Sequence, residues 1–144
     1  NFYGSRIYMK TNLTGIILSA STTGAFICSY FMDLTLDNVE QYVALVSVLL
    51  VDGFFGVWAG AKREGFKTFK ALKVLKSIFF WILLLTAILT IEKAFLGTEW
   101  LSETILIPFL IFQILSILKN ASMLGLVPLK VLKQILDKID QHKH

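Results

Sequence analysis

The chain has little of the chemistry from which enzyme sites are built. Its 144 residues include one cysteine and two histidines, and no Ser/His/Asp set, phosphate-binding glycine loop or metal-ligand spacing occurs. The lone Cys28 excludes an internal disulfide, and its expected role in an apolar stretch is that of a small buried side chain. The histidines, His142 and His144, stand at the end of the chain, where a pair rarely binds a metal alone. We therefore expect no enzyme and no cofactor.

Polar residues are too few for an ordinary soluble domain of this length. Hydrophobic residues make up 56% of the chain and gather in four long runs joined by short polar segments. About 20 apolar residues suffice to cross a bilayer. The pattern predicts an all-α integral membrane protein, a single membrane domain over 1–144 with four transmembrane helices, a basic interfacial segment and a C-terminal amphipathic helix. The predicted spans are 13–32, 42–61, 77–96 and 104–120, and the predicted amphipathic tail is 126–140.

Charge alternates between the connecting segments. The segments 33–41 and 97–103 contain acids without Lys or Arg, whereas the segment after the second run and the tail are basic. The positive-inside rule therefore predicts a multi-pass protein of the bacterial cytoplasmic membrane with both termini in the cytoplasm. Lysines and phenylalanines interleave in the basic segment, which favours an interfacial helix over nucleic-acid binding. The predicted cytoplasmic anchor comprises Lys62, Arg63, Lys67, Lys70, Lys73 and Lys76.

An acid stands near the middle of the second run. An ionised carboxylate there is costly in lipid, so we expect Asp52 to face protein or an internal aqueous space, and it is a candidate functional residue. Small residues follow it at spacings that let helix backbones approach closely, and a second small-residue stripe marks the first run. The first run is also the least apolar, which makes it the candidate lining of any aqueous passage. The predicted packing residues are Gly15, Ser19, Thr23, Gly53, Gly56 and Gly60.

The tail has a two-sided pattern. Pro128 is placed to start a helix, after which apolar residues follow one side and charged residues the other. Such a short helix is marginal unless its apolar side meets a membrane surface or another helix.

The stretch from Phe112 to Leu136, FQILSILKNASMLGLVPLKVLKQIL, resembles the carboxyl-terminal signature of the phage lysis and toxin-secretion holins. The Asp-x-x-x-Gly pattern from Asp52 to Gly56, followed by a basic stretch and another span, is similar to a span of that family. Lys119 departs from the glutamate usual in the family, and the turn has one proline rather than two. The residues that carry the signature are Gln113, Ser116, Asn120, Gly125 and Pro128.

The resemblance implies a holin, which oligomerises in the host's cytoplasmic membrane and opens large lesions for an endolysin or a toxin, with an antiholin as a further partner. Two alternatives stay open. The isolated Asp52 favours a small ion or proton channel or transporter. A membrane scaffold that acts through its tail is the other alternative. The partners expected are membrane lipid and further copies of the chain, with no nucleic acid.

Overall fold

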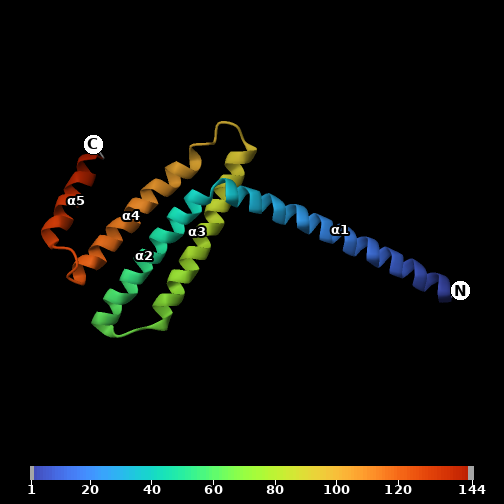
Figure 1. Cartoon of the computed structure of the whole chain (residues 1–144), viewed down its shortest axis with the longest axis horizontal. Coiled ribbons are helices and arrows are strands. Elements are labelled where there is room, and N and C mark those ends of the chain that lie inside the picture. The colour runs from blue at the N-terminus through green and yellow to red at the C-terminus, as the bar shows by residue number, and fades with distance from the viewer. Residues whose placement is uncertain (1, 143–144) are drawn as a thin grey trace. The chain divides into compact units, whose positions relative to one another are not determined.

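A computed structural model describes residues 2–142, and these residues form helices and connecting turns without a strand (Figure 1). The helices are α1 (Phe2–Asp37), α2 (Val39–Glu64), α3 (Thr68–Ala94), α4 (Leu101–Met123) and α5 (Leu129–His142). The first four are long and apolar enough to cross a membrane. The predicted all-α fold with four membrane-spanning helices is therefore confirmed.

The chain divides into two compact units, with the boundary between Asn38 and Val39. The first unit is α1, an uninterrupted helix of 36 residues. Its hydroxyl groups bond to the backbone of the preceding turn: Thr22 Oγ1 donates to Leu18 O at 2.8 Å, and Thr14 Oγ1 donates to Lys10 O at 2.8 Å. Such bonds hide polar groups within the helix, so α1 offers lipid few unsatisfied donors.

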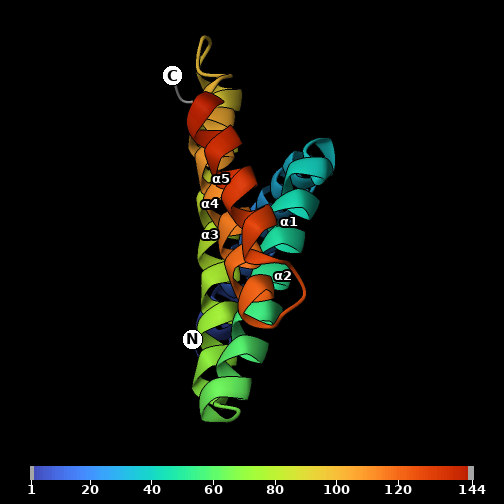
Figure 2. The same ribbon diagram turned by 90° about the vertical axis from the view of Figure 1, so that its left-hand side faces the viewer.

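The second unit is a bundle in which α2 packs on both α3 and α4 (Figures 1 and 2). Short connections join successive helices, and Gly65 and Gly97 in these connections have φ near +86° and +85°. A side chain would be strained at such angles, so glycine allows these tight reversals. The buried core comprises Tyr42, Leu45, Leu49, Ala59, Leu85, Ile88, Leu89, Leu106 and Ala121.

Specific contacts fix the bundle in register. Tyr42 Oη and Thr86 Oγ1 are 2.7 Å apart between α2 and α3, and the rings of Trp81 and Phe109 stack between α3 and α4 with centroids 3.5 Å apart. At the connection between α3 and α4, a Glu92 carboxylate oxygen accepts a hydrogen bond from the backbone N–H of Ser102, a residue only 1% exposed. This carboxylate satisfies one of the free N–H groups at the start of α4.

Two local expectations differ from the structure. The basic segment is not a separate helix, because α2 continues to Glu64 and α3 runs from Thr68 to Ala94 without a break. The lysines from Lys70 to Lys76 are therefore the first turns of α3 itself. In addition, the predicted fourth span begins at residue 104, which would put Pro108 near its first turn, whereas α4 begins at Leu101 and Pro108 lies two turns inside the helix.

A tight turn connects α4 to α5. The N–H of Leu126 donates to Ala121 O at 2.9 Å, and the N–H of Gly125 donates to Ser122 O at 3.0 Å. This pattern closes a helix when the residue after its end has a positive φ, and Gly125 has φ +76°. Pro128 then accepts the first hydrogen bonds of α5. The predicted signature residues Gly125 and Pro128 thus make the turn after which α5 lies beside α4 (Figures 1 and 2).

Candidate functional site

Polar side chains follow the facing sides of α2 and α4 in the half of the bundle near the basic end. On α2 the inward positions recur at alternating spacings of three and four, from Tyr42 through Leu49 to Asp52 and Gly56. On α4 the positions at the same spacing are apolar at Leu106 and Phe109 and polar at Gln113, Ser116 and Asn120. We call Asp52, Gln113, Ser116 and Asn120 the polar seam.

The register of the seam follows from one close approach. A Cβ placed on Gly56 would lie 3.6 Å from Asn120 Nδ2, so these positions face each other. The helices α2 and α4 run in the same direction (Figure 1). One turn earlier on each helix, Asp52 and Ser116 therefore come to the same level, with Gln113 just before them. The structure thus brings the predicted acid to the predicted signature residues.

Two oxygen atoms of the seam have no hydrogen-bond partner among the described residues. Asp52 Oδ1 and Gln113 Oε1 are both buried, although each residue as a whole is only partly buried. A buried acceptor left unpaired costs about 1–3 kcal/mol, and more when it is charged. The seam is therefore a polar layer with unsatisfied acceptors inside an otherwise apolar bundle, able to accept hydrogen bonds from water or from a neighbouring chain.

The glycines of α2 face two different helices. A Cβ on Gly53 would overlap both γ-methyl groups of Val74 on α3, whereas a Cβ on Gly60 would lie 2.8 Å from the flexible end of Lys70. Gly56 faces α4 instead. The small residues of α2 are thus divided between the faces turned toward α3 and toward α4.

The predicted stripe of α1 meets no neighbour in its own unit. Nothing lies within 4 Å of a Cβ built on Gly15, and the hydroxyls of Ser19 and Thr23 donate to Ile16 O and Ser19 O of the same helix at 3.0 and 2.9 Å. The role of these residues in helix packing stays a prediction.

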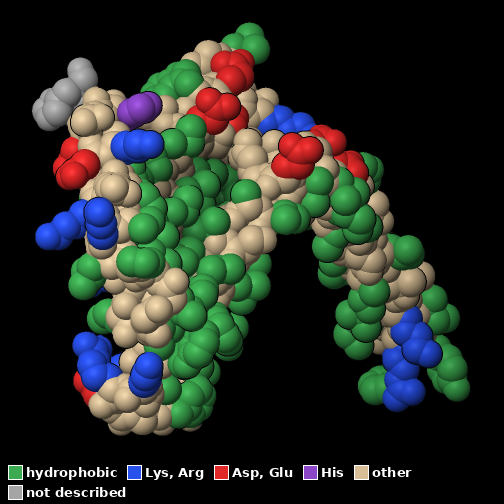
Figure 3. Space-filling model, turned by 60° about the vertical axis from the view of Figure 1, so that its left-hand side comes forward, with side chains coloured by type: hydrophobic (Ala, Val, Ile, Leu, Met, Phe, Trp, Pro, Cys, Tyr) green, Lys and Arg blue, Asp and Glu red, His purple; other side chains and the backbone are tan. Residues whose placement is uncertain are grey.

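The predicted basic anchor lies at the end of the bundle where α2 turns into α3. Figure 3 shows Lys and Arg gathered there, away from the apolar sides of the helices. Glu64 pairs with two lysines, at 3.3 Å from Lys67 Nζ and 3.6 Å from Lys70 Nζ. The hydrogen bond from Lys67 and the charges of Lys70 and Arg63 hold the pKa of the exposed Glu64 carboxyl below its ordinary value. The other anchor residues, Lys62, Lys73 and Lys76, are exposed.

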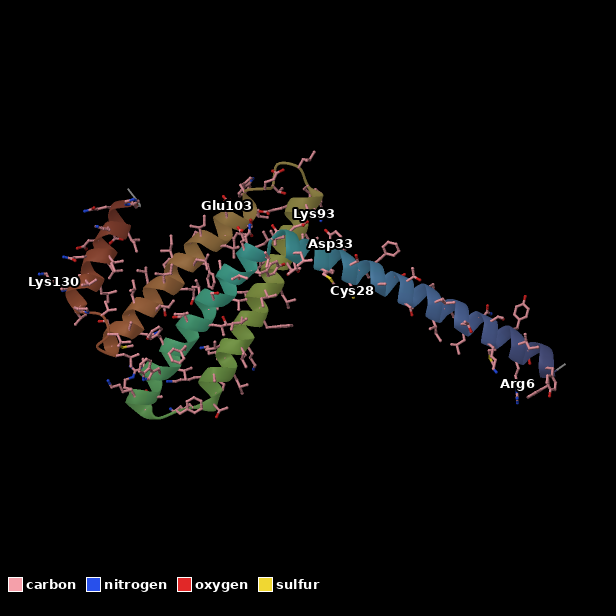
Figure 4. All side chains as sticks on the ribbon, in the orientation of Figure 1. Arg6, Cys28, Asp33, Lys93, Glu103 and Lys130 are labelled. Atoms are coloured by element: carbon pink, nitrogen blue, oxygen red, sulfur yellow. The ribbon has the colours of Figure 1, made fainter. Side chains whose placement is uncertain are left out.

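Acids and one lysine mark the opposite end of the bundle. Figure 4 shows Lys93 and Glu103 on either side of the connection between α3 and α4. Sequence reasoning did not find the role of Glu92 here, and its only signal was an acid at the end of one apolar run and shortly before the next.

The described residues contain no group of three or more side chains suited to hold a metal ion. His142 ends α5, and His144 lies outside the described residues. The chemistry on view is that of helix association and of a buried polar layer.

Comparison with known proteins identifies this arrangement. A model of the bacteriophage holin family matches residues 30–141, a range that includes the polar seam, the basic anchor, the Gly125 turn and nearly all of α5. Comparisons with curated proteins and with solved structures give no match. The chain is a multi-pass membrane protein and belongs to the bacteriophage holin family.

Proposed function

We propose that the protein oligomerises in the bacterial cytoplasmic membrane and opens lesions that release an endolysin or a toxin. The observation that carries this proposal is the family match over residues 30–141. The polar seam supports it, because buried acceptors without partners favour a rearrangement that gives them water or a neighbouring chain. A folded enzyme is tens of ångströms wide, so the lesion needs walls from many subunits. Membrane lipid and further copies of the chain are the partners of this step, and an antiholin would act on assembly.

Orientation follows from charge. Before a lesion opens, we place the basic anchor, α5 and both termini on the cytoplasmic side, with the acidic connections on the other side. Single cysteines introduced after Cys28→Ser test this placement with a membrane-impermeant thiol reagent on intact, unlysed cells. Leu96→Cys, in a connection where Leu96 is 99% exposed, should react from outside, and Lys70→Cys should not. Reaction at Lys70→Cys from outside would contradict the placement.

Assembly has a candidate surface on α1. Gly15, Ser19 and Thr23 form the small-residue stripe of α1, which is open in its own unit and is suited to close helix contact with a second copy. The same helix carries more hydroxyl groups than the others, and composition alone makes it one candidate for the lining of the passage.

The experiment that tests the function measures the size of what crosses. Induced expression in a bacterium should stop growth abruptly after a delay, and a co-expressed muralytic enzyme without an export signal should then lyse the cells. The control is the same enzyme without the protein, which should leave the cells intact. Loss of ions from the cells while the enzyme is retained would contradict the lesion proposal.

That outcome would instead favour a narrow ion or proton channel. The observation behind this second candidate is the buried, unpartnered Oδ1 of Asp52 on the face turned toward α4. Asp52→Asn distinguishes the two: it should abolish ion flux through a channel that uses the carboxylate, whereas in a lesion-forming protein it should keep insertion and change the time of lysis.

A further inference from the structure

The position of α5 in the bundle conflicts with a lipid environment. The apolar side of α5 faces α4 across a groove of ≈ 500 Å³, lined by Ile111 and Ile114 of α4 and by Ile135, Lys138, Ile139 and His142 of α5. Ile111 and Ile114 lie near the middle of the 23-residue α4. If α4 crosses the membrane, the second half of α5 therefore reaches the middle of the bilayer.

The opposite side of α5 is charged. Leu132, Ile135 and Ile139 are half-buried, whereas the charged residues between them are exposed, and Figure 4 shows Lys130 projecting from the side turned away from α4. Charged side chains at the middle of a bilayer are expensive unless they meet water or a partner. In the second half of α5 the charges concerned are Asp137 and Asp140, with Lys138 at the edge of the groove.

Two placements satisfy these residues. In one, α5 leaves α4 and lies in the membrane interface, with its apolar side toward lipid. In the other, α5 stays on α4 and its charged side faces water at the depth of the bilayer. The described fold has α5 on α4, as the second placement requires, and the turn at Gly125 and Pro128 directs α5 there.

We propose that α5, held against α4, lines the aqueous lumen of the open lesion. The isoleucines of α5 cover the apolar side of α4. The charged side of α5 then forms the outer surface at this place, and that surface can contact water. This assigns the lumen to α5 rather than to α1, whose hydroxyls already donate to their own backbone. The inference rests on the proposed function and specifies which surface of the subunit faces the passage.

The first test fixes α5 in place. In a Cys28→Ser background, Ile114→Cys and Ile135→Cys are joined by a short bifunctional thiol reagent in membranes, and enzyme release is measured. The bridged protein should still release the enzyme, because the open lesion already has α5 on α4. Failure of the bridge to form in active membranes, or loss of release with the bridge while each single cysteine variant releases normally, would overturn the proposal.

The second test obstructs the lumen. A polyethylene glycol maleimide attached at Asp137→Cys should block release of a folded enzyme from liposomes that contain the purified protein, while small ions still leak. The same polymer at Leu96→Cys is the matched control and should leave enzyme release unchanged, because that connection lies at the far end of the bundle from the Gly125 turn. Equal release from the two modified proteins would show that α5 does not line the passage.

Assays of the unmodified protein distinguish a failure of the proposed function from a failure of the α5 assignment. If it releases no enzyme from liposomes or cells, the proposed function fails. If it releases enzyme and the bridge or polymer results go against expectation, only the assignment of α5 fails.

Discussion

The helix α1 and the bundle from α2 to α4 use similar small residues with opposite results. In the bundle, Gly53 stands opposite the branched side chain of Val74, so its missing Cβ is what lets α2 and α3 meet. In α1, Gly15 stands opposite nothing within its own unit. A small-residue stripe therefore marks where a helix can be approached, but only a large side chain on a second helix turns the stripe into a contact.

The largest difference in the free energy of unfolding should come from adding a methyl group at Gly53 and at Gly15. Gly53→Ala should lower the free energy of unfolding by about 1–3 kcal/mol, because the new methyl group overlaps Val74 in a packed interface. Gly15→Ala should instead be neutral or raise it by about 0.5–1 kcal/mol, the usual gain of alanine over glycine in a helix. Unfolding of the purified protein in mixed micelles measures both. Equal destabilisation would show that the α1 stripe is packed against another helix.

The next effect should come from the polar seam, where a substitution should raise the free energy of unfolding instead of lowering it. Gln113→Met removes a buried oxygen that lacks a partner and keeps the side-chain length, so the bundle should become more stable by about 1–3 kcal/mol. If the unsatisfied oxygen helps the lesion open, the same variant should delay lysis at equal protein accumulation. Ile107→Met, at an exposed site on α4, is the matched control and should change neither quantity. Destabilisation by Gln113→Met would mean that the amide has a partner in the membrane.

The all-α class and the four membrane-spanning helices could be read from the sequence, because each run of about 20 apolar residues is a strong and local signal. The position of a polar residue relative to other helices is not local. The sequence placed Asp52 in a span and Gln113 in a signature, but only the approach of Gly56 to Asn120 shows that they belong to one layer. The division of the α2 glycines between α3 and α4 likewise depends on the bundle.

The first residue of α3 could not be predicted from the sequence for a related reason. The lysines from Lys67 to Lys76 indicated a membrane-surface segment, and charge patterns do mark where a membrane begins. They do not mark where a helix ends, since lysine is a good helix former and nothing between Lys70 and Ser77 breaks the helix. The role of Glu92 was missed because it depends on how α4 returns to the end of α3.

Hydroxyl groups allow a finer comparison of the same two regions. Thr86 Oγ1 donates to Ile82 O at 2.8 Å, so Tyr42 is the donor in the bond of 2.7 Å between α2 and α3. Tyr42→Phe should cost about 0.6 kcal/mol, the average for such bonds between membrane helices. Thr23→Val in α1 should cost less, because the Thr23 hydroxyl bonds only to its own helix. A larger cost for Thr23→Val in the same unfolding assay would reveal a partner for α1.

The smallest effect on the free energy of unfolding should come from the charged end of the bundle, where the ion pairs are exposed to solvent. Glu64→Gln removes the pairs with Lys67 and Lys70, and their exposure to solvent and salt leaves such pairs little net stabilisation. Because the folded state lowers the pKa of Glu64, any stabilisation is present at neutral pH and is lost as the pH falls through that lowered pKa. The unfolding midpoints of parent and variant should therefore differ slightly at neutral pH in low salt and converge in acid or in high salt. A difference that persists in acid would show that Glu64 stabilises the turn between α2 and α3 through something other than its charge.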